Sequence, residues 1–341
     1  MWQPTVDVLD SGAVVLGENV VCDGYAPGRE FRVQTHIHDD HMGEFDRSKG
    51  CQDIVLSPET LSLLIAEYNA DLAYRENLLP VCRGVIKELQ DGSSVQLLAS
   101  NHILGSCQVA VQRVDGKRVG YSGDFGWPLD EVIEVDELVV DSTYGSPRSV
   151  RRYTQEEAEA RLVELVVQRL RYGCVHIRAH RGTVERVLQL LGDDVGVPVL
   201  ASERLIQEAL VYQEHGFAVG TLVSLQSDEG THALAQRSFV RLYSKGDGFR
   251  NEVTDGGTTI VCSAFMVDVD DPLKVFSDRA YSVALSNHAD FYETLEYVKA
   301  TKAKVIVTDN TRNHGQELAM AINQSLIGVR AVPSTNLQSM A

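Results

Sequence analysis

The stretch THIHDDHMGEF, residues 35–45, crowds three histidines and three acidic residues directly after a short strand-like segment. His36 and His38 alternate at the end of that strand, so both imidazoles point to one side of it. Asp40 and His41 follow in a tight turn. Imidazole and carboxylate are natural zinc ligands. A solvated turn would instead favour Asn, Ser and Gly, so the spacing predicts a metal cradle.

The net charge of the chain limits which partners it can attract. The 341 residues carry 48 acidic and 31 basic side chains, a formal charge of −17. A protein that binds nucleic acid through its overall charge is expected to be basic. A polyanionic substrate would therefore need a local positive site here, such as a metal ion.

The cysteines are widely scattered and form no CxxC pair, so a cysteine-based zinc site is not expected. In a chain of this length they indicate reduced thiols and a cytoplasmic location. We find no signal-peptide pattern and no run of 18 apolar residues, which predicts no membrane span. The cysteines are Cys22, Cys51, Cys82, Cys107, Cys174 and Cys262.

The pattern of predicted elements changes near residue 145. The first part is rich in short apolar strands that end at polar residues. A long amphipathic helix is predicted over 154–173, followed by strand–helix alternation that is typical of a parallel sheet, including a strand at 258–265. A second change is expected near 285, before a final helix–strand–helix unit over 292–326.

Three further motifs carry a histidine or an aspartate directly after a predicted strand. They are VVCDG with Asp23, SNHILGS with His102 and YSGDFG with Asp124. A lone residue of this kind is common at a strand end, or inside a core. Together with THIHDDH, in this order, the motifs resemble the metallo-β-lactamase superfamily.

That resemblance implies two divalent metal ions, with zinc as the first choice and manganese as the second. It places His36, His38 and His102 on one metal, Asp40 and His41 on the other, and Asp124 between the two. Asp23 would orient a ligand histidine from behind. Asp39 and Glu44 are not needed to complete this ligand set.

Two later motifs narrow the resemblance to the β-CASP nucleases of that superfamily. VVDSTYGSP contains Asp141, and LSNHADF contains His288. By resemblance, His288 protonates the leaving oxygen of a phosphodiester and Asp141 holds His288, so Asp40, Asp141 and His288 are the expected catalytic residues. The alternatives are an ordinary turn for DSTYG and a helix N-cap for SNHADF.

The resemblance implies an α/β fold of a particular kind. A metallo-β-lactamase αββα sandwich would comprise residues 1–145 and 285–341, interrupted by a β-CASP α/β domain over 146–284.

The segment KVIVTDNTRNHGQELAMAI departs from the pattern in which a strand ends directly in His-Gly. Either the turn is longer and His314 is the seventh metal ligand, or Asp309 at the strand end replaces it. The residue type favours His314 and the position favours Asp309; His314 is preferred, with Asp309 as its alternative. A third possibility is that neither binds, which would leave the second metal weak or absent. His176, His180, His215 and His232 lie in no motif and are interpreted as structural or surface histidines.

The expected activity is metal-dependent hydrolysis of nucleic-acid phosphodiesters. RNA, as in RNA processing, is placed slightly ahead of single-stranded DNA, because a histidine at 314 would match the RNA-directed relatives. The alternatives are a DNA exonuclease of the ligase-associated type, a catalytically silent nucleic-acid-binding subunit and a small-molecule hydrolase. A homodimer is left open.

Overall fold

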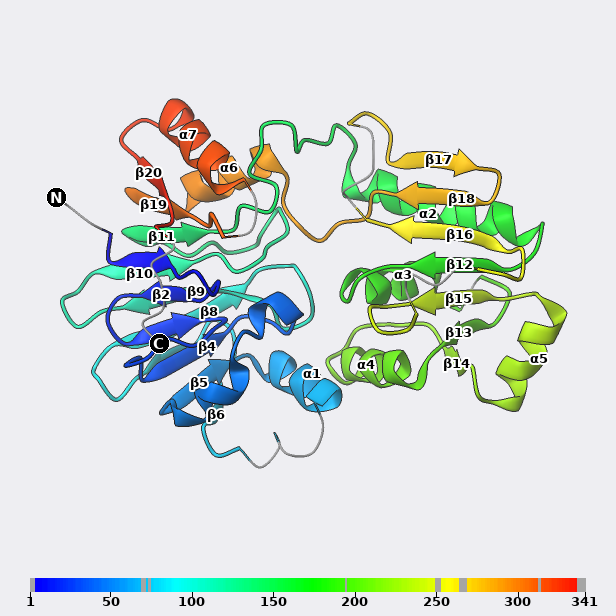
Figure 1. The fold of residues 1–341 in the computed structure, drawn as a ribbon, viewed down its shortest axis with the longest axis horizontal. Coiled ribbons are helices and arrows are strands. Elements are labelled where there is room, and N and C mark those ends of the chain that lie inside the picture. Colours follow the sequence, from blue (N-terminus) through cyan, green and yellow to red (C-terminus); the bar gives the residue numbers. More distant parts are fainter. Residues whose placement is uncertain are drawn as a thin grey trace. The chain divides into compact units, whose positions relative to one another are not determined.

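The computed structural model divides the chain into two compact units, shown in Figure 1. Unit 1 comprises residues 1–150 and 288–341, and unit 2 comprises 151–287. The structure describes residues 4–68, 72, 75–193, 195–248, 253–263, 269–311 and 314–335. Within these ranges, no helix has both the length and the apolar character that crossing a membrane requires.

One sheet of unit 1 has six strands in sequential order. The β1–β2 and β2–β3 pairs are antiparallel, and β3 to β6 run parallel to one another. The strands are β1 (Val6–Val8), β2 (Val14–Leu16), β3 (Val20–Cys22), β4 (Phe31–Gln34), β5 (Asp53–Leu56) and β6 (Leu78–Pro80).

The other sheet of unit 1 has the order β20-β19-β11-β10-β9-β8-β7. β7 to β10 pair as antiparallel neighbours, whereas β10, β11, β19 and β20 are parallel. The strands are β7 (Ile86–Glu88), β8 (Ser94–Ala99), β9 (Cys107–Gln112), β10 (Arg118–Tyr121), β11 (Glu137–Val140), β19 (Val305–Thr308) and β20 (Arg330–Pro333).

The main core of unit 1 lies between these two sheets. It joins side chains such as Val33 and Val55 of the first sheet to Val109 and Val139 of the second. Helices α6 (Phe291–Ala300) and α7 (Gly315–Ser325) pack on the second sheet through a separate core that includes Tyr297. Because Leu138 and Val139 are neighbours on one strand and face opposite sides, this sheet is buried on both faces.

Helix α1 (Pro58–Tyr68) follows β5 directly and contacts β6. Ser57 and Thr60 donate hydrogen bonds to the Gly105 carbonyl, at 2.8 and 3.0 Å. This contact ties the start of α1 to the loop between β8 and β9, where His102 lies.

Unit 2 is built on a seven-stranded sheet in the order β14-β13-β15-β12-β16-β18-β17. All its pairs are parallel except β17–β18. The strands are β12 (Val175–Arg178), β13 (Val199–Ala201), β14 (Leu222–Ser224), β15 (Val240–Tyr243), β16 (Thr258–Cys262), β17 (Leu273–Ser277) and β18 (Ala280–Val283).

The helices of unit 2 connect these strands. Side chains of α2, α3 and α4 form one core with Val175, Ile177 and Ile260 of the sheet, while α5 packs against Leu200 and Phe239. The helices are α2 (Gln155–Leu170), α3 (Thr183–Leu191), α4 (Glu203–Glu214) and α5 (Asp228–Gln236). The α/β class and the mainly parallel sheet after residue 145 were predicted; residues 264 and 265 of the predicted strand at 258–265 lie outside the described ranges.

Candidate metal centre

The histidine-rich stretch begins where β4 ends and closes in a 3₁₀ turn, Asp39–His41. Two polar side chains of β4 hold it from beneath. The Gln34 side-chain amide donates to the carbonyls of His36 and His41, at 2.6 and 3.1 Å. Arg32, which is fully buried, donates to the His41 carbonyl and to both Gln34 and Ser48. The turn is therefore fixed through the backbone carbonyls of His36 and His41.

Four of the predicted ligands converge on one point. His38 Nδ1 lies 3.2 Å from His36 Nε2 and 3.1 Å from His102 Nε2. Asp124 Oδ2 lies 3.7 Å from the Nε2 atoms of both His36 and His102. Ligand atoms of these four residues all lie within 4.8 Å of one another. Three imidazole nitrogens and one carboxylate oxygen form a donor set suited to zinc.

The second carboxylate oxygen of Asp124 faces a different histidine. Asp124 Oδ1 is 3.1 Å from His41 Nε2, so one oxygen of Asp124 faces His41 while the other faces His36 and His102. Asp40 Oδ2 lies 3.9 Å from the same nitrogen, and the Asp40 side chain is 64% exposed. The structure thus places the exposed Asp40 carboxylate near the buried His41 ring.

Asp23 could be counted as a ligand by distance, together with His36 and His41. Its hydrogen bonds indicate a different role. Asp23 Oδ2 contacts His41 Nδ1 at 2.7 Å and the Thr35 hydroxyl at 2.6 Å, and Oδ1 accepts from the Thr35 amide. A carboxylate on Nδ1 orients the ring and leaves Nε2 for a metal, so we interpret Asp23 as a positioning residue.

The protonation equilibria suit a cation at this centre. Burial and the neighbouring His41 lower the pKa of His36 well below its usual value, so His36 is neutral, the form that binds metal. Burial raises the pKa of Asp124, but the facing His41 and His288 outweigh this and hold it well below its usual value. Asp124 is therefore an anion surrounded by imidazoles.

Three turns that carry site residues have unusual backbone conformations. Gly123 has a φ of 57°, and a Cβ there would lie 2.6 Å from the Cys107 carbonyl oxygen, so only glycine fits before Asp124. Asp23 and Asn101 also have positive φ, at 54° and 55°. Strained backbone of this kind clusters at functional sites, where surrounding hydrogen bonds stabilise it.

His288, the predicted general acid, and its predicted partner Asp141 also lie at this centre. His288 Nδ1 is 3.4 Å from Asp141 Oδ2, and His288 Nε2 is 3.9 Å from Asp124 Oδ2. Burial lowers the pKa of His288, but the carboxylates of Asp141 and Asp124 raise it by more than burial lowers it. The pKa of His288 is therefore above its usual value. The His288 side chain is 20% exposed, and its ring packs 4.4 Å from that of His102. His288 is thus a partly accessible imidazole with an increased tendency to hold a proton.

The two candidates for the seventh ligand lie in different surroundings. Asp309 is buried directly after β19, and its Oδ1 accepts hydrogen bonds from Thr311. His314 precedes α7 with its side chain 42% exposed and its Nδ1 3.2 Å from Glu317. Within the described residues, neither belongs to the close groups of ligand atoms.

Gly315 has a packing reason for its place after His314. A Cβ at residue 315 would lie 2.5 Å from the Asp309 carbonyl oxygen. Glycine at residue 315 is therefore required by the close start of α7, whether or not His314 binds metal.

Several supporting residues were missed from the sequence. Thr35, Gln34 and Arg32 position the histidines, and the Tyr144 ring packs 5.6 Å from that of His288. The available signal was the segment FRVQT, in which polar residues occupy a strand that is buried throughout. A buried arginine and a buried glutamine on one strand need hydrogen-bond partners, which are either each other or the polar groups of a nearby site.

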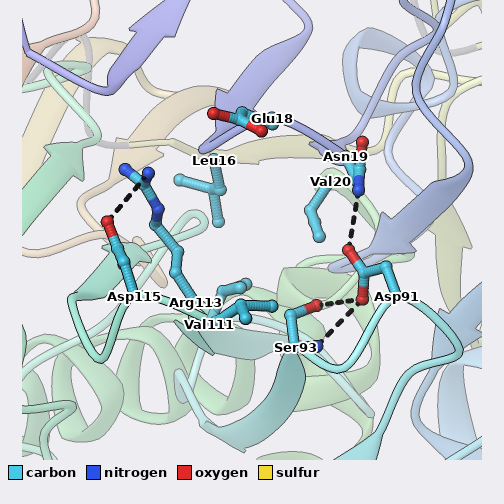
Figure 2. A pocket seen from close by; sticks show the side chains of 10 residues that line it. Leu16, Glu18, Asn19, Val20, Asp91, Ser93, Val111, Arg113 and Asp115 are labelled. Atoms are coloured by element: carbon cyan, nitrogen blue, oxygen red, sulfur yellow. Dashed lines mark hydrogen bonds and ion pairs between the residues drawn. The ribbon is translucent and has the colours of Figure 1, made fainter.

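A pocket of about 430 Å³ lies in another part of unit 1, shown in Figure 2. Its lining includes Ser93, which precedes β8, whereas His102 follows the end of the same strand. Asp91 accepts hydrogen bonds from Asn19 and Ser93 in this pocket, and Arg113 pairs with an aspartate of the β9–β10 turn. The pocket therefore lies at the opposite end of β8 from the metal centre and shares no residue with it.

Comparisons with known proteins agree with an α/β architecture of this type. No protein-family model matches the chain. A crystal structure of a protein of unknown function from Enterococcus faecalis V583 is similar over 90% of this chain and 80% of that one, with a TM-score of 0.62 and 13% identity. At this identity the likeness shows the fold alone.

Two curated relatives match in sequence. An RNase J-like protein of Methanocaldococcus jannaschii is 25% identical over 213 residues, which cover 54% of this chain and 49% of the relative. This chain thus spans about half the length of that relative.

The uncharacterized protein in the lig 3′ region of Acidianus ambivalens is 32% identical over 108 residues, which cover 31% of this chain and 76% of the relative. The chain belongs to the same family as this Acidianus ambivalens protein.

Proposed function

We propose that the chain is a metal-dependent nuclease of the metallo-β-lactamase superfamily, with unit 2 as its β-CASP insertion. The observation that carries the proposal is the meeting of two groups. Ligand atoms of His36, His38, His102 and Asp124 converge within 4.8 Å, and His288 with its partner Asp141 stands against the same Asp124. A ligand set beside a proton donor is what hydrolysis with a poor leaving group requires.

The residues present fit divalent metal ions. When bound, such ions would supply Lewis-acid polarisation of a phosphoryl oxygen and lower the pKa of an attacking water. His36, His38 and His102 would hold one ion, and His41 with Asp40 the other, with Asp124 between them. Asp309 is our preferred seventh ligand, because it is buried beside Ser142 directly after β19, whereas His314 is paired with Glu317 at the surface.

His288 has the role of general acid in this proposal. Its Nδ1 faces Asp141, so Nε2 is the nitrogen that presents a proton toward the leaving sugar oxygen. Asp141 is itself fixed, since its Oδ1 accepts from the amide and hydroxyl of Thr143 and its amide nitrogen lies 2.9 Å from the Ser122 hydroxyl. A positioned general acid contributes about 10²–10⁴-fold to the rate.

RNA is the first substrate proposed, on the strength of the RNase J-like relative. Single-stranded DNA is the second, and two observations favour it. The Acidianus relative takes its name from the lig 3′ region. In addition, the resemblance to RNA-directed relatives depended on a histidine as the seventh metal ligand. That argument is weaker because His314 lies at the surface.

The test is cleavage of end-labelled single-stranded RNA and DNA, side by side, with Mn²⁺ or Zn²⁺. We expect cleavage by the native chain and by Asp39→Ala, and no cleavage by His36→Ala. Asp39 is the matched control because it lies in the same turn with an exposed side chain. No cleavage of either polymer by the metal-loaded native chain would refute the proposal and support a silent binding subunit.

A second substrate isolates the role of His288. An aryl phosphodiester releases a phenolate, which leaves without being protonated. His288→Ala should therefore reduce cleavage of nucleic acid by about 10²-fold or more, and cleavage of the aryl ester much less. Equal losses on both substrates would show that His288 does not act as the acid.

A further inference from the structure

Unit 2 contains a second cluster of metal-ligand side chains, well apart in sequence from the centre in unit 1. Cys174 immediately precedes β12, and His176 lies within that strand. Asp255 belongs to the loop that leads into the neighbouring parallel strand, β16. The main chain joins the two segments directly, since the Thr258 amide donates to the Cys174 carbonyl at 2.9 Å.

The three side chains point at one another. His176 Nε2 lies 2.9 Å from Asp255 Oδ2, and the Cys174 thiol donates to the same oxygen at 3.5 Å. The three ligand atoms all lie within 4.8 Å of one another. A tetrahedral zinc ion would separate sulfur from oxygen by about 3.6 Å and nitrogen from oxygen by about 3.4 Å. Opening the His176–Asp255 contact by roughly half an ångström would therefore admit the ion.

The imidazole is oriented for this task. The Tyr243 hydroxyl lies 3.0 Å from His176 Nδ1, which leaves Nε2 directed at the cysteine and the aspartate. Ligand histidines typically have their other nitrogen engaged in this way. Tyr243 is itself held, because the Arg241 guanidinium lies 4.4 Å from the centre of its ring.

The loop that carries Asp255 is also fixed. Asp255 Oδ1 accepts from the Gly257 amide at 2.8 Å, Arg237 donates to the Asp255 carbonyl, and Arg279 donates to the Gly256 carbonyl. Gly257 is needed for the close approach, because a Cβ there would lie 2.8 Å from Cys174 Sγ and 2.9 Å from His176 Cδ2.

The three proposed ligands differ in how far they are buried. Cys174 and His176 are buried, at 1% and 3% exposure, whereas the Asp255 side chain is 33% exposed. The cluster thus has closed walls and one side open to water, which would provide an entry path and a fourth ligand.

We propose that Cys174, His176 and Asp255 bind a single zinc ion that joins β12 to the loop before β16. Thiolate, imidazole and carboxylate are zinc ligands, and the thiolate disfavours hard cations such as Mg²⁺ and Ca²⁺. Binding releases the Cys174 proton to solvent and involves no change in oxidation state. The two anionic ligands balance the ion's charge, and Arg237, which donates to the Asp255 carbonyl, adds a positive charge beside them.

Cobalt distinguishes this site from the centre in unit 1. A thiolate bound to Co²⁺ gives a charge-transfer absorption band in the near ultraviolet, whereas imidazole and carboxylate ligands give none. The unit 1 group consists of histidines and aspartates, so the band reports on the unit 2 cluster alone. Titration of the metal-free full chain with Co²⁺ should produce the band and saturate it at one equivalent of thiolate-bound cobalt.

Variants complete the test. Cys174→Ser should abolish the band and lower the bound zinc by one ion per chain, while Cys262→Ser should change neither. Cys262 is the matched control because it is a buried cysteine of the same sheet whose side chain belongs to the apolar core. Asp255→Asn preserves shape, keeps the thiolate, and should retain the band at a Co²⁺ concentration at least tenfold higher.

Circular dichroism of each variant would show that it folds. The absence of a band in the native chain, or its persistence in Cys174→Ser, would overturn the proposal and leave a hydrogen-bonded Cys–Asp–His–Tyr network. So would a zinc content that is the same in the native chain and in Cys174→Ser.

Discussion

Asp124 organises the centre of unit 1 at the scale of single residues, because its two oxygens face different histidines. Oδ2 faces His36 and His102, and Oδ1 faces His41. The His41 side is held by Asp23, which is buried and accepts three hydrogen bonds besides its contact with His41. The charge of Asp23 should therefore matter for metal affinity even though Asp23 does not face the ion.

Asp23→Asn should weaken binding of the metal at His41 by about 10–100-fold, the usual cost of losing a partner behind a ligand histidine. Asparagine is the most informative substitute, because it removes the charge and still tolerates the positive φ of this position. Isothermal titration of the metal-free chain with Zn²⁺ measures the change. Asp39→Asn serves as the control, and equal affinities in the two variants would contradict the positioning role.

The seventh ligand can be decided by a matched pair of substitutions. Asp309→Asn should lower the occupancy of the second metal and reduce cleavage by at least about tenfold, because Asp309 is buried at the strand end. His314→Ala should change both by less than twofold, since the His314 side chain is 42% exposed and paired with Glu317. Metal content and rate are both measured, and the reverse order of effects would assign the site to His314.

Glu185 should make the stability of the fold depend on pH, independently of either candidate metal site. Burial and the nearby Glu208 raise the pKa of Glu185 to about 8, above the usual value of 4.5 for this side chain. The folded chain therefore binds a proton that the unfolded chain releases, and the stability of the fold falls as pH rises from about 4.5 to about 8.

Glu185→Gln removes this dependence. Between pH 5 and pH 9 the variant should gain roughly 1–4 kcal/mol relative to the native chain, measured as the free energy of unfolding in urea. Glu214→Gln, at an exposed position of α4, is the control. A constant difference between variant and native chain across this pH range would contradict the raised pKa.

Helix α6 shows, at the scale of elements, how one motif serves two purposes. His288 faces Asp141 and Asp124, and two residues later Asp290 caps the helix. Asp290 Oδ1 accepts from the Glu293 amide, and the Asp290 amide donates back to the Glu293 carboxylate. The two interpretations of SNHADF, a catalytic motif and a helix N-cap, are therefore compatible in one segment.

Asp290→Ala should destabilise the chain by about 0.5–2 kcal/mol, the usual cost of a lost N-cap. Asp290→Asn should cost only a few tenths, because asparagine caps almost equally well. Urea unfolding measures both. If the two variants lose the same stability, the carboxylate has a role other than capping.

Elements with strong local signals were predictable from the sequence. The helix predicted over 154–173 is observed as Gln155–Leu170, where Thr154 and Glu157 form the capping box. β7 and β17 gave no comparable signal, because both are edge strands whose residues are mostly exposed and lack an apolar pattern. Short edge strands are defined by their neighbours rather than by their own residues.

The same contrast applies to the two clusters of candidate metal ligands. THIHDDH places four candidate ligands within six residues, so the sequence reveals it. His176 and Asp255 are 79 residues apart and meet only because β12 and β16 are neighbours in the sheet. The expectation that no cysteine would bind zinc rested on the absence of CxxC spacing. The proposed site at Cys174 departs from it, because spacing along the chain cannot detect ligands that a parallel sheet brings together.

The distribution of charge is the property of the whole molecule that bears most on its substrate. The chain carries a formal charge of −17, yet a nucleic acid would bring more negative charge to it. In the proposed function the attraction comes from metal ions held by buried imidazoles, over a short range, and not from a basic surface. Such a protein should depend little on counterion release for binding.

Salt dependence tests this at the scale of the whole chain. Proteins that neutralise 6–10 phosphates lose about 10³–10⁵ in affinity between about 50 and 200 mM salt. Here we expect KM for a single-stranded oligonucleotide to rise by less than about tenfold over that range, at a constant divalent metal concentration. Two opposing effects set this value: monovalent salt weakens the few phosphate contacts, and it also screens the repulsion between the acidic chain and the polyanion. A steeper rise would reveal an extended basic binding surface and would place the main attraction outside the metal centre.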